Sequence, residues 1–334
     1  MTYISVVIPN YNSSKTIKQT IHALCNQTYS DFDVTIVDDG SQDDSSTLIK
    51  DSIQANQKFK LIELPKNQGA SFARNIGAEN SKGAILLFTD SDVVLKNDTL
   101  YRAAKFFQNN STSHALVGLP DKNSSFHNLP SEHFNLRVHH NYINLPREIN
   151  ILYTSICAVQ RDAFNQVDGF NTRMRSEEDP ELGFRLSRAG YVIISDKELS
   201  VYHNKWISLT GLLKNDYKRS LSRVKLMFRE RATKTILKKK TFISTPITQI
   251  YSALVMPFVW LSLFISIFNP LILISTGLLL LFFLKLNFGY LTFTLEEKGF
   301  FTTLKLYGLL LIDMTAVDFG IFVGLLKYIA GEKY

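Results

Sequence analysis

The sequence predicts an α/β domain built on a mostly parallel sheet with flanking helices, followed by an all-α membrane segment. Two observations support this prediction. Across residues 4–88, short apolar runs of strand length alternate with amphipathic stretches of helix length, which is the pattern of a parallel sheet covered by helices. From Thr241 to Leu284 the chain then runs for 44 positions without Asp, Glu, Lys or Arg, although a bilayer span needs only about 20.

The expected strands are short and rich in β-branched residues, and turn-forming residues follow them. We expect strands at Ile4–Ile8, Phe32–Val37, Lys60–Leu64, Ala84–Phe88 and, farther along, Ser155–Val159. The stretches between the first four have apolar residues at helical spacing, and we expect helices at Thr16–Gln27, Ser45–Ala55 and Gly69–Asn80. Because parallel strands end at the same edge of a sheet, ligands of this domain are expected just beyond those ends.

Carboxylates follow two of the expected strands. Asp38 and Asp39 come after one strand, and Asp90-Ser91-Asp92 comes after another. Two carboxylates so placed can hold Mg²⁺ or Mn²⁺, which can also bind a nucleotide's phosphates. A carboxylate can also accept a hydrogen bond from a base N–H or a ribose hydroxyl. Asp is common in turns and at helix N-caps as well, so the flanking stretches decide between the two interpretations.

Common nucleotide-binding loops are absent from these flanking stretches. The first turn has Pro9-Asn10-Tyr11-Asn12 in place of a Gly-x-Gly-x-x-Gly sequence, and no Walker lysine loop occurs in the chain. Asn67 and Arg74 lie between the two acidic segments. Arg74 can pair with a diphosphate, and a surface arginine on a helix is the alternative.

Four motifs together resemble the family 2 glycosyltransferases, which have the GT-A fold. They are Ser5-Val6-Val7-Ile8-Pro9-x-Tyr11-Asn12, Val37-Asp38-Asp39-Gly40-Ser41, Ala73-Arg74-Asn75-x-Gly77-Ala78 and Asp90-Ser91-Asp92, in the family's order and spacing. The resemblance covers about residues 3–206. It implies that Pro9, Tyr11 and Asp39 frame the base, that Asp90 lies near the ribose, and that Asp92 holds the metal. The nucleotide-sugar site is then completed by Asn12, Asp38, Asn67, Arg74 and Ser91.

A second acidic segment, Glu177-Glu178-Asp179-Pro180, precedes another expected helix. The resemblance implies that Asp179 is the catalytic base, with Glu178 beside it. Helix rules offer an alternative, in which Asp179 is the N-cap and Pro180 the first helical residue. Partial burial beside Glu178 would raise the pKa of Asp179 and the helix N-terminus would lower it, and the sequence does not decide between them.

His203 resembles the family's trailing histidine, which in some members completes the metal or diphosphate site. A buried structural histidine is the alternative. The Gln-x-x-Arg-Trp sequence of the family's processive polysaccharide synthases is absent, which favours the addition of one or a few sugars.

We divide the chain into a catalytic domain at residues 1–206, a basic amphipathic linker at 207–240 and a membrane region at 241–334. The segment from Lys214 to Lys240 contains eleven basic and two acidic residues. Its local charge is 11 − 2 = +9, in a chain of net charge +7. The linker is expected to be helical at Leu209–Thr233 and to lie at the membrane surface. A solvated helix face is the alternative, and no motif favours nucleic-acid binding.

Three apolar segments follow the linker, at Pro246–Phe268, Leu271–Leu284 and Leu306–Leu326. They predict two or three membrane helices, the third being interrupted by Asp313 and Asp318, which are costly in lipid unless they face protein. No secretory signal peptide is recognised. The positive-inside bias places the catalytic domain on the cytosolic face of a multi-pass protein, with Asn269-Pro270 on the far side.

We therefore expect a metal-dependent, inverting hexosyltransferase that uses Mn²⁺ or Mg²⁺ and a nucleotide-diphosphate sugar, with UDP as the expected nucleotide. The expected acceptor is a hydroxyl of a membrane-associated, lipid-linked glycan. One alternative is transfer to a polyprenyl phosphate, and another is an inactive membrane-bound nucleotide-sugar-binding protein. The sequence does not identify the sugar, the linkage or the oligomeric state.

Overall fold

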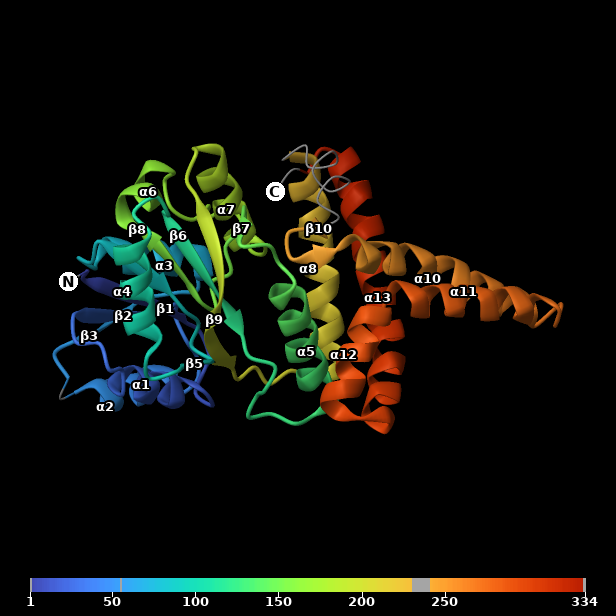
Figure 1. Ribbon diagram of the computed structural model, residues 1–334, viewed down its shortest axis with the longest axis horizontal. Coiled ribbons are helices and arrows are strands. Elements are labelled where there is room, and N and C mark those ends of the chain that lie inside the picture. Colours follow the sequence, from blue (N-terminus) through green and yellow to red (C-terminus); the bar gives the residue numbers. More distant parts are fainter. Residues whose placement is uncertain (1, 55, 230–240, 333–334) are drawn as a thin grey trace. The chain divides into compact units, whose positions relative to one another are not determined.

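A computed structural model describes residues 2–54, 56–229 and 241–332, which form two compact units (Figure 1). The first unit comprises Met1–Phe126 and Tyr142–Lys205, and the second comprises His127–Asn141 and Trp206–Tyr334. The chain passes between the units three times, and the sequence-based boundary after residue 206 lies close to the third passage, at residues 205–206. The sequence-based division places residues 127–141 in the catalytic domain, whereas the structure groups them with the C-terminal helices.

The first unit is built on a nine-stranded sheet whose main order is β3-β2-β1-β4-β8-β6-β9-β5, with β7 paired to β9. The strands are β1 (Ile4–Asn10), β2 (Phe32–Asp38), β3 (Phe59–Glu63), β4 (Ile85–Phe88), β5 (Val93–Leu95), β6 (Ala115–Pro120), β7 (Glu148–Ile149), β8 (Cys157–Gln160) and β9 (Ile193–His203). Its helices are α1 (Ile17–Cys25), α2 (Ser45–Ile53), α3 (Ala70–Glu79), α4 (Thr99–Asn109), α6 (Arg161–Gln166) and α7 (Glu178–Arg188). All the expected strands and helices of this half are present, with boundaries within a few residues.

The sheet is mixed rather than mostly parallel. Strands β1, β2, β3 and β4 are parallel, as expected, but β8 pairs antiparallel with both β4 and β6, and β5 and β7 pair antiparallel with β9. The strand–helix alternation that predicts parallel pairing is confined to the first ninety or so residues. Beyond it, the sequence pattern carries no information on strand direction.

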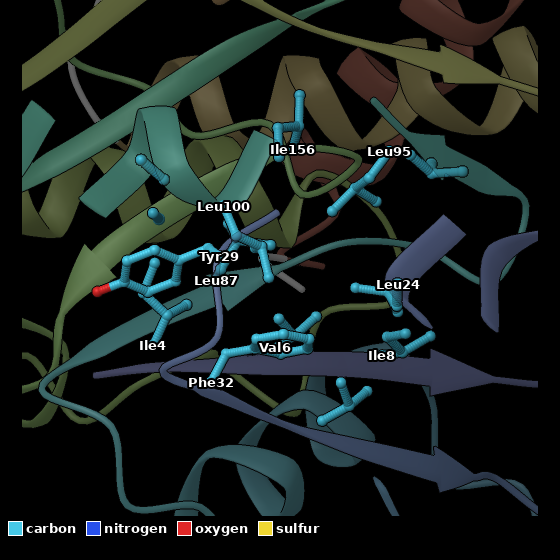
Figure 2. Close-up of a cluster of buried hydrophobic side chains, with 14 of the residues drawn as sticks. Ile4, Val6, Ile8, Leu24, Tyr29, Phe32, Leu87, Leu95, Leu100 and Ile156 are labelled. Carbon is cyan, nitrogen blue, oxygen red and sulfur yellow. The ribbon is translucent and has the colours of Figure 1, made fainter. Parts of the chain in front are cut away.

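Alternate residues of the central strands face opposite sides of the sheet. On one side, Val6 and Ile8 of β1 pack with Leu24 of α1 and Leu100 of α4 in a buried apolar core (Figure 2). On the other side, α3 lies close to the sheet because Gly77 has no side chain: a Cβ there would stand 2.4 Å from Val7 Cγ1. Helices therefore cover both faces of the sheet. The loops that follow the strands lie at its edge, outside these helix layers.

A separate aromatic cluster packs beneath the edge of the sheet where β4 ends. The ring of Phe88 lies 5.3 Å from that of Phe164 and 5.1 Å from that of Phe170. Asn75 of α3 anchors the same region, because its side-chain amide donates to Phe170 O (2.8 Å) and accepts from Phe170 N (2.9 Å). This packing ties α3 to the segment that leads into α7.

The described part of the second unit is helical apart from a short antiparallel pair, β10 (Thr241–Phe242) and β11 (Thr245–Pro246). Its helices are α5 (Leu129–Ile143, of which residues up to Asn141 belong to this unit), α8 (Leu209–Arg229), α10 (Ile247–Ser266), α11 (Ile272–Leu286), α12 (Phe288–Lys298) and α13 (Phe300–Ile329). Helices α8 and α13 lie side by side, as do α10 and α11 (Figure 1). Gly320 allows the close approach of α13 to α8, since a Cβ there would stand 2.4 Å from Tyr217 O. The expected linker helix beyond Arg229, and the rest of the linker to residue 240, lie outside the described residues.

Residues 127–141 belong to this unit through both apolar and charged contacts. Leu136 of α5 is fully buried in a core with Met256 and Leu310. Arg137 pairs with Asp216 of α8 and, at 2.8 Å, with Asp313 of α13. Asp313 is fully buried, so the acidic residue that is costly in lipid faces protein.

Within the described residues, α10 and α13 are each long and apolar enough to cross a membrane. Helices α11 and α12 meet this criterion only together, and they are bent by 70° where they join. The expectation of two or three apolar helices is therefore met in length and composition. The second expected segment ends in a sharp bend at Asn287, a feature that hydropathy does not reveal.

Candidate active site

The carboxyl ends of β1 and β2 form a network of loops in which both predicted carboxylates have protein partners. Asp38 accepts hydrogen bonds from Asn10 Nδ2 (2.6 Å) and Ser41 Oγ (2.5 Å). Asp39 is 2% exposed, and its two oxygens accept from the backbone N–H groups of Gln68 and Gly69, each at 2.7 Å. In this structure Asp38 shapes its own turn, while Asp39 holds the loop that contains Asn67.

Tyr11 is the exposed aromatic residue at this edge. The residue is 47% exposed, and the next residue, Asn12, has a φ of 51°. Asn12 is fixed from both sides, since it donates from its backbone N to Ser41 Oγ (2.9 Å) and accepts from Gln42 N at 2.7 Å. Pro9 is the second-to-last residue of β1, and Asn67 is exposed. A flat, exposed ring on a fixed loop is suited to stacking against a base.

The predicted acidic pair at the end of β4 lies farther along the same edge. Asp90 Oδ1 pairs with Arg74 Nη2 at 2.8 Å, and Asp90 Oδ2 accepts from Ser155 Oγ at 2.9 Å. Between the two acids, the carbonyl of Ser91 accepts from Thr20 Oγ1 at 3.1 Å. Each oxygen of Asp90 has a second lone pair, so these contacts leave it able to bind a cation.

Arg74 is a buried charged residue of the site, at 4% exposure. Its guanidinium pairs with Asp90 through Nη2 and with Glu178 Oε1 through Nη1, at 2.8 and 2.9 Å. Burial opposes the charged form, but the charges of Asp90, Glu178 and Asp179 outweigh it and hold the pKa of Arg74 above its ordinary value. The alternative of a surface arginine on a helix is therefore wrong, because α3 directs Arg74 into the interior.

The strand register brings Asp92 to His203. In the antiparallel pair of β5 and β9, Val93 stands opposite His203, and Asn204 N donates to the carbonyl of Asp92 at 2.8 Å. His203 Nε2 consequently lies 3.3 Å from Asp92 Oδ1. Burial raises the pKa of the Asp92 carboxyl, but His203 and Lys205 outweigh burial and hold it below its ordinary value.

Asp90, Asp92 and His203 form a group that fits a divalent metal ion. One ligand atom from each lies within 4.8 Å of the others, and carboxylate oxygen with imidazole nitrogen is a donor set that Mn²⁺ accepts. Asp92 Oδ1 is also buried, and it faces His203 Nε2 at 3.3 Å. With the ring proton of His203 on Nδ1, this oxygen and this nitrogen present lone pairs to each other, which is costly when both atoms are buried. A cation held by these three side chains would remove that cost.

Helix α7 presents Glu178 and Asp179 to this group. Its N-cap is Glu177, a non-glycine residue in the left-handed region with φ 62°, and Glu178 and Asp179 are the first two helical residues. The interpretation of Asp179 as the N-cap is therefore wrong. Asp179 Oδ2 instead accepts from the backbone N–H of Thr154, at 3.3 Å. Acidic residues in this first turn are favourable because the helix N-terminus carries partial positive charge.

Three residues of the site were not predicted from the sequence. They are Tyr153, Thr154 and Ser155, which precede β8 and contact His203, Asp179 and Asp90 respectively. The strand was expected to begin at Ser155, so these residues had been assigned no role. Their contribution depends on antiparallel pairing between β4 and β8. The local sequence pattern does not predict this pairing.

Residues 5–168 match the model of glycosyl transferase family 2. This segment belongs to that family. The chain is 37% identical over 110 residues to an uncharacterised glycosyltransferase of Haemophilus influenzae, covering 33% of this chain and 44% of that protein. It is 30% identical over 115 residues to the putative teichuronic acid biosynthesis glycosyltransferase TuaG of Bacillus subtilis, covering 34% and 46%. The matched part thus spans less than half the length of these relatives.

Solved structures share the fold. The mannosyltransferase PcManGT of Pyrobaculum calidifontis, in complex with GDP-Man and Mn²⁺, matches with a TM-score of 0.60 at 16% identity, over 99% of this chain and 88% of that chain. S. aureus TarS 1–349 in complex with UDP matches with a TM-score of 0.52 at 20% identity, over 69% of this chain. These similarities confirm the GT-A fold.

The buried position of Arg74 generates a prediction about stability. In Arg74→Met, Asp90 and Glu178 lose their common partner, and we expect the free energy of unfolding to fall by about 3 kcal/mol, as for one partner removed from a buried ion pair. Arg102→Met is the matched control, since Arg102 also contacts two acids, Asp98 (2.6 Å) and Glu198 (3.5 Å), but is 44% exposed. Its loss should be below about 1 kcal/mol. Urea unfolding of both variants measures this, and equal losses would contradict the prediction.

Proposed function

We propose that this chain is a membrane-associated, inverting glycosyltransferase that takes its sugar from a nucleotide-diphosphate donor. The observation that supports this most directly is the convergence of Asp90, Asp92 and His203 with Asp179 at one edge of a family 2 GT-A domain. The nucleotide complexes of the similar structures support a nucleotide-sugar donor. We propose UDP as the nucleotide and a hexosyl group as the transferred sugar.

The donor's base would stack on Tyr11 beside Pro9 and Asn12, in the loop network closed by Asp38 and Asp39. Asn67 belongs to the loop that Asp39 holds through Gln68 and Gly69. The ribose and diphosphate would then extend along the sheet edge past Ser91 toward Asp90. Arg74 already bridges two acids, so its part is to hold Asp90 in place beneath the diphosphate.

Asp90, Asp92 and His203 would hold the divalent ion, Mn²⁺ or Mg²⁺, which when bound supplies a Lewis acid for the departing diphosphate. Asp179 Oδ2 is engaged by Thr154 N, and a carboxylate has further lone pairs that can take the acceptor's hydroxyl proton. Glu178 is held by Arg74 and is therefore less free to act as the base. A placed general base contributes about 10²- to 10⁴-fold.

The second unit supports a location at a membrane. Exposed apolar side chains are concentrated on α10, α11 and the turn between them, among them Phe258, Phe264, Ile267, Phe268, Ile274 and Leu278. A soluble surface rarely carries so many together. We propose that these helices are embedded in lipid, that the basic face of α8 lies at the cytosolic surface, and that the acceptor is a lipid-linked glycan with a free hydroxyl. A polyprenyl phosphate acceptor, being already ionised, would make Asp179 less important.

The metal role is tested with Asp92→Ala and with EDTA. We expect either change to abolish transfer from labelled UDP-sugars to membrane lipids, since both remove the cation from the diphosphate. Asp98→Ala, which changes an exposed carboxylate on a helix N-cap, should retain transfer. Full transfer in EDTA, or in a folded Asp92→Ala protein, would refute the metal role. The same lipid products identify the sugar and the acceptor.

The base role is tested with Asp179→Asn. An amide oxygen can still accept the hydrogen bond from Thr154 N, so the melting temperature and the UDP affinity should hold. Turnover should fall by about 10²-fold or more, because the amide cannot take a proton. Turnover within about threefold of wild type would instead favour a phosphate acceptor. A protein that binds UDP but transfers no sugar even with Asp179 intact would be an inactive binding protein.

The orientation is tested with cysteine labelling, for which the native thiols are suited. Cys25 is exposed and Cys157 is buried. With Cys25 changed to Ser, Asn269→Cys at the α10–α11 turn should react with an impermeant thiol reagent in intact cells. The native Cys25 should react only after permeabilisation. The opposite pattern would overturn the proposed cytosolic catalytic domain.

A further inference from the structure

Three consecutive residues outside the family's acidic motifs each contact a different functional side chain. Tyr153 Oη lies 3.3 Å from His203 Nδ1. Thr154 donates its backbone N–H to Asp179 Oδ2 at 3.3 Å, and Ser155 donates its hydroxyl to Asp90 Oδ2 at 2.9 Å. The segment therefore contacts two candidate metal ligands and the candidate base within three residues.

Strand pairing produces this arrangement. In the antiparallel pair of β4 and β8, Phe88 stands opposite Cys157. Continued for two residues along each strand, the same register places Asp90 opposite Ser155. Thr89 Oγ1 also donates to the carbonyl of Ser155, at 2.9 Å. The position of Ser155 is thus fixed by the sheet and not only by its own side chain.

The surroundings of the segment leave it little room to move. Tyr153, Thr154 and Ser155 are 5%, 4% and 2% exposed, and the ring of Tyr142 lies 4.5 Å from that of Tyr153. On the side of α7, Gly183 allows direct contact with the backbone that precedes the segment, because a Cβ there would stand 2.4 Å from Ile151 Cα. Helix α7, which carries Asp179, therefore packs directly on the chain that leads into Tyr153.

We propose that Tyr153–Ser155 is a positioning element that sets the distance between the metal-binding side chains and the base. This inference rests on the proposed function. His203 can bind a metal through the Nε2 lone pair only if Nδ1 carries the ring proton, and Tyr153 Oη is placed to accept that proton's hydrogen bond. Ser155 fixes the carboxylate plane of Asp90, and the N–H of Thr154 fixes Asp179. None of the three acts on substrate directly.

The test measures Mn²⁺ affinity of the full-length protein in detergent, by electron paramagnetic resonance of free Mn²⁺, together with transfer. Tyr153→Phe and Ser155→Ala each remove one hydroxyl. We expect each to weaken Mn²⁺ binding by about tenfold, in the range found when partners of metal ligands are removed. Because the ligands themselves remain, saturating Mn²⁺ should restore most of the lost transfer. A purely structural defect would not respond to the metal.

Two control variants match these changes away from the site. Tyr29→Phe removes a hydroxyl that donates to Thr2 O at 2.7 Å, and Ser5→Ala removes one that donates to Asp33 at 2.6 Å. Both should keep wild-type Mn²⁺ affinity. Wild-type Mn²⁺ affinity in Tyr153→Phe and Ser155→Ala, or a loss of transfer that excess Mn²⁺ does not restore, would overturn the positioning role alone. A wild-type protein that binds no Mn²⁺ would overturn the proposed metal site and this inference with it.

Discussion

The geometry of the site depends on one buried arginine side chain, that of Arg74. Arg74 leaves α3 and reaches Asp90 at the end of β4 and Glu178 at the start of α7, so a single guanidinium joins the sheet edge to the helix that carries Asp179. Arginine suits this place because its planar fork can meet two carboxylates at once. Without it, the acids of Asp90, Glu178 and Asp179 would repel one another in a poorly solvated space. The first role of Arg74 is therefore structural: it allows several acidic side chains to lie close together.

The local patterns were sufficient for the first half of the fold but not for the second. Apolar runs and helical spacing located β1 to β4 and their helices, because those elements are parallel and separated by short crossovers. Strand β8 has the same kind of sequence and runs the other way, since direction is set by pairing between distant strands. The role of Ser155 was not predicted for the same reason. It contacts Asp90, 65 residues away in the sequence, only because β4 and β8 pair.

The candidate site shows the same division. Its acidic residues were recognised because Asp90, Asp92 and Asp179 belong to family motifs. Their partners were not, because Thr154 acts through a backbone N–H that any residue could supply, and Tyr153 through a hydroxyl 50 positions from His203. Interchangeable donors of this kind leave no signature in a single sequence. The N-cap rule failed at Asp179 for a related reason: the helix starts earlier, at a left-handed Glu177.

The two units are interleaved along the chain, and this affects how the protein can be made. Helix α5 emerges early in synthesis, yet the buried partner of His133, Asp313, follows 180 residues later. At about 5–20 residues per second, Leu136 and Arg137 wait on the order of ten to forty seconds for the helices that bury them. A chain cut after residue 206 would keep α5 and lose every one of those helices. Residues 1–206 expressed alone would therefore expose the apolar and charged side chains of α5 that other helices normally bury. We expect such a fragment to aggregate or to bind a chaperone.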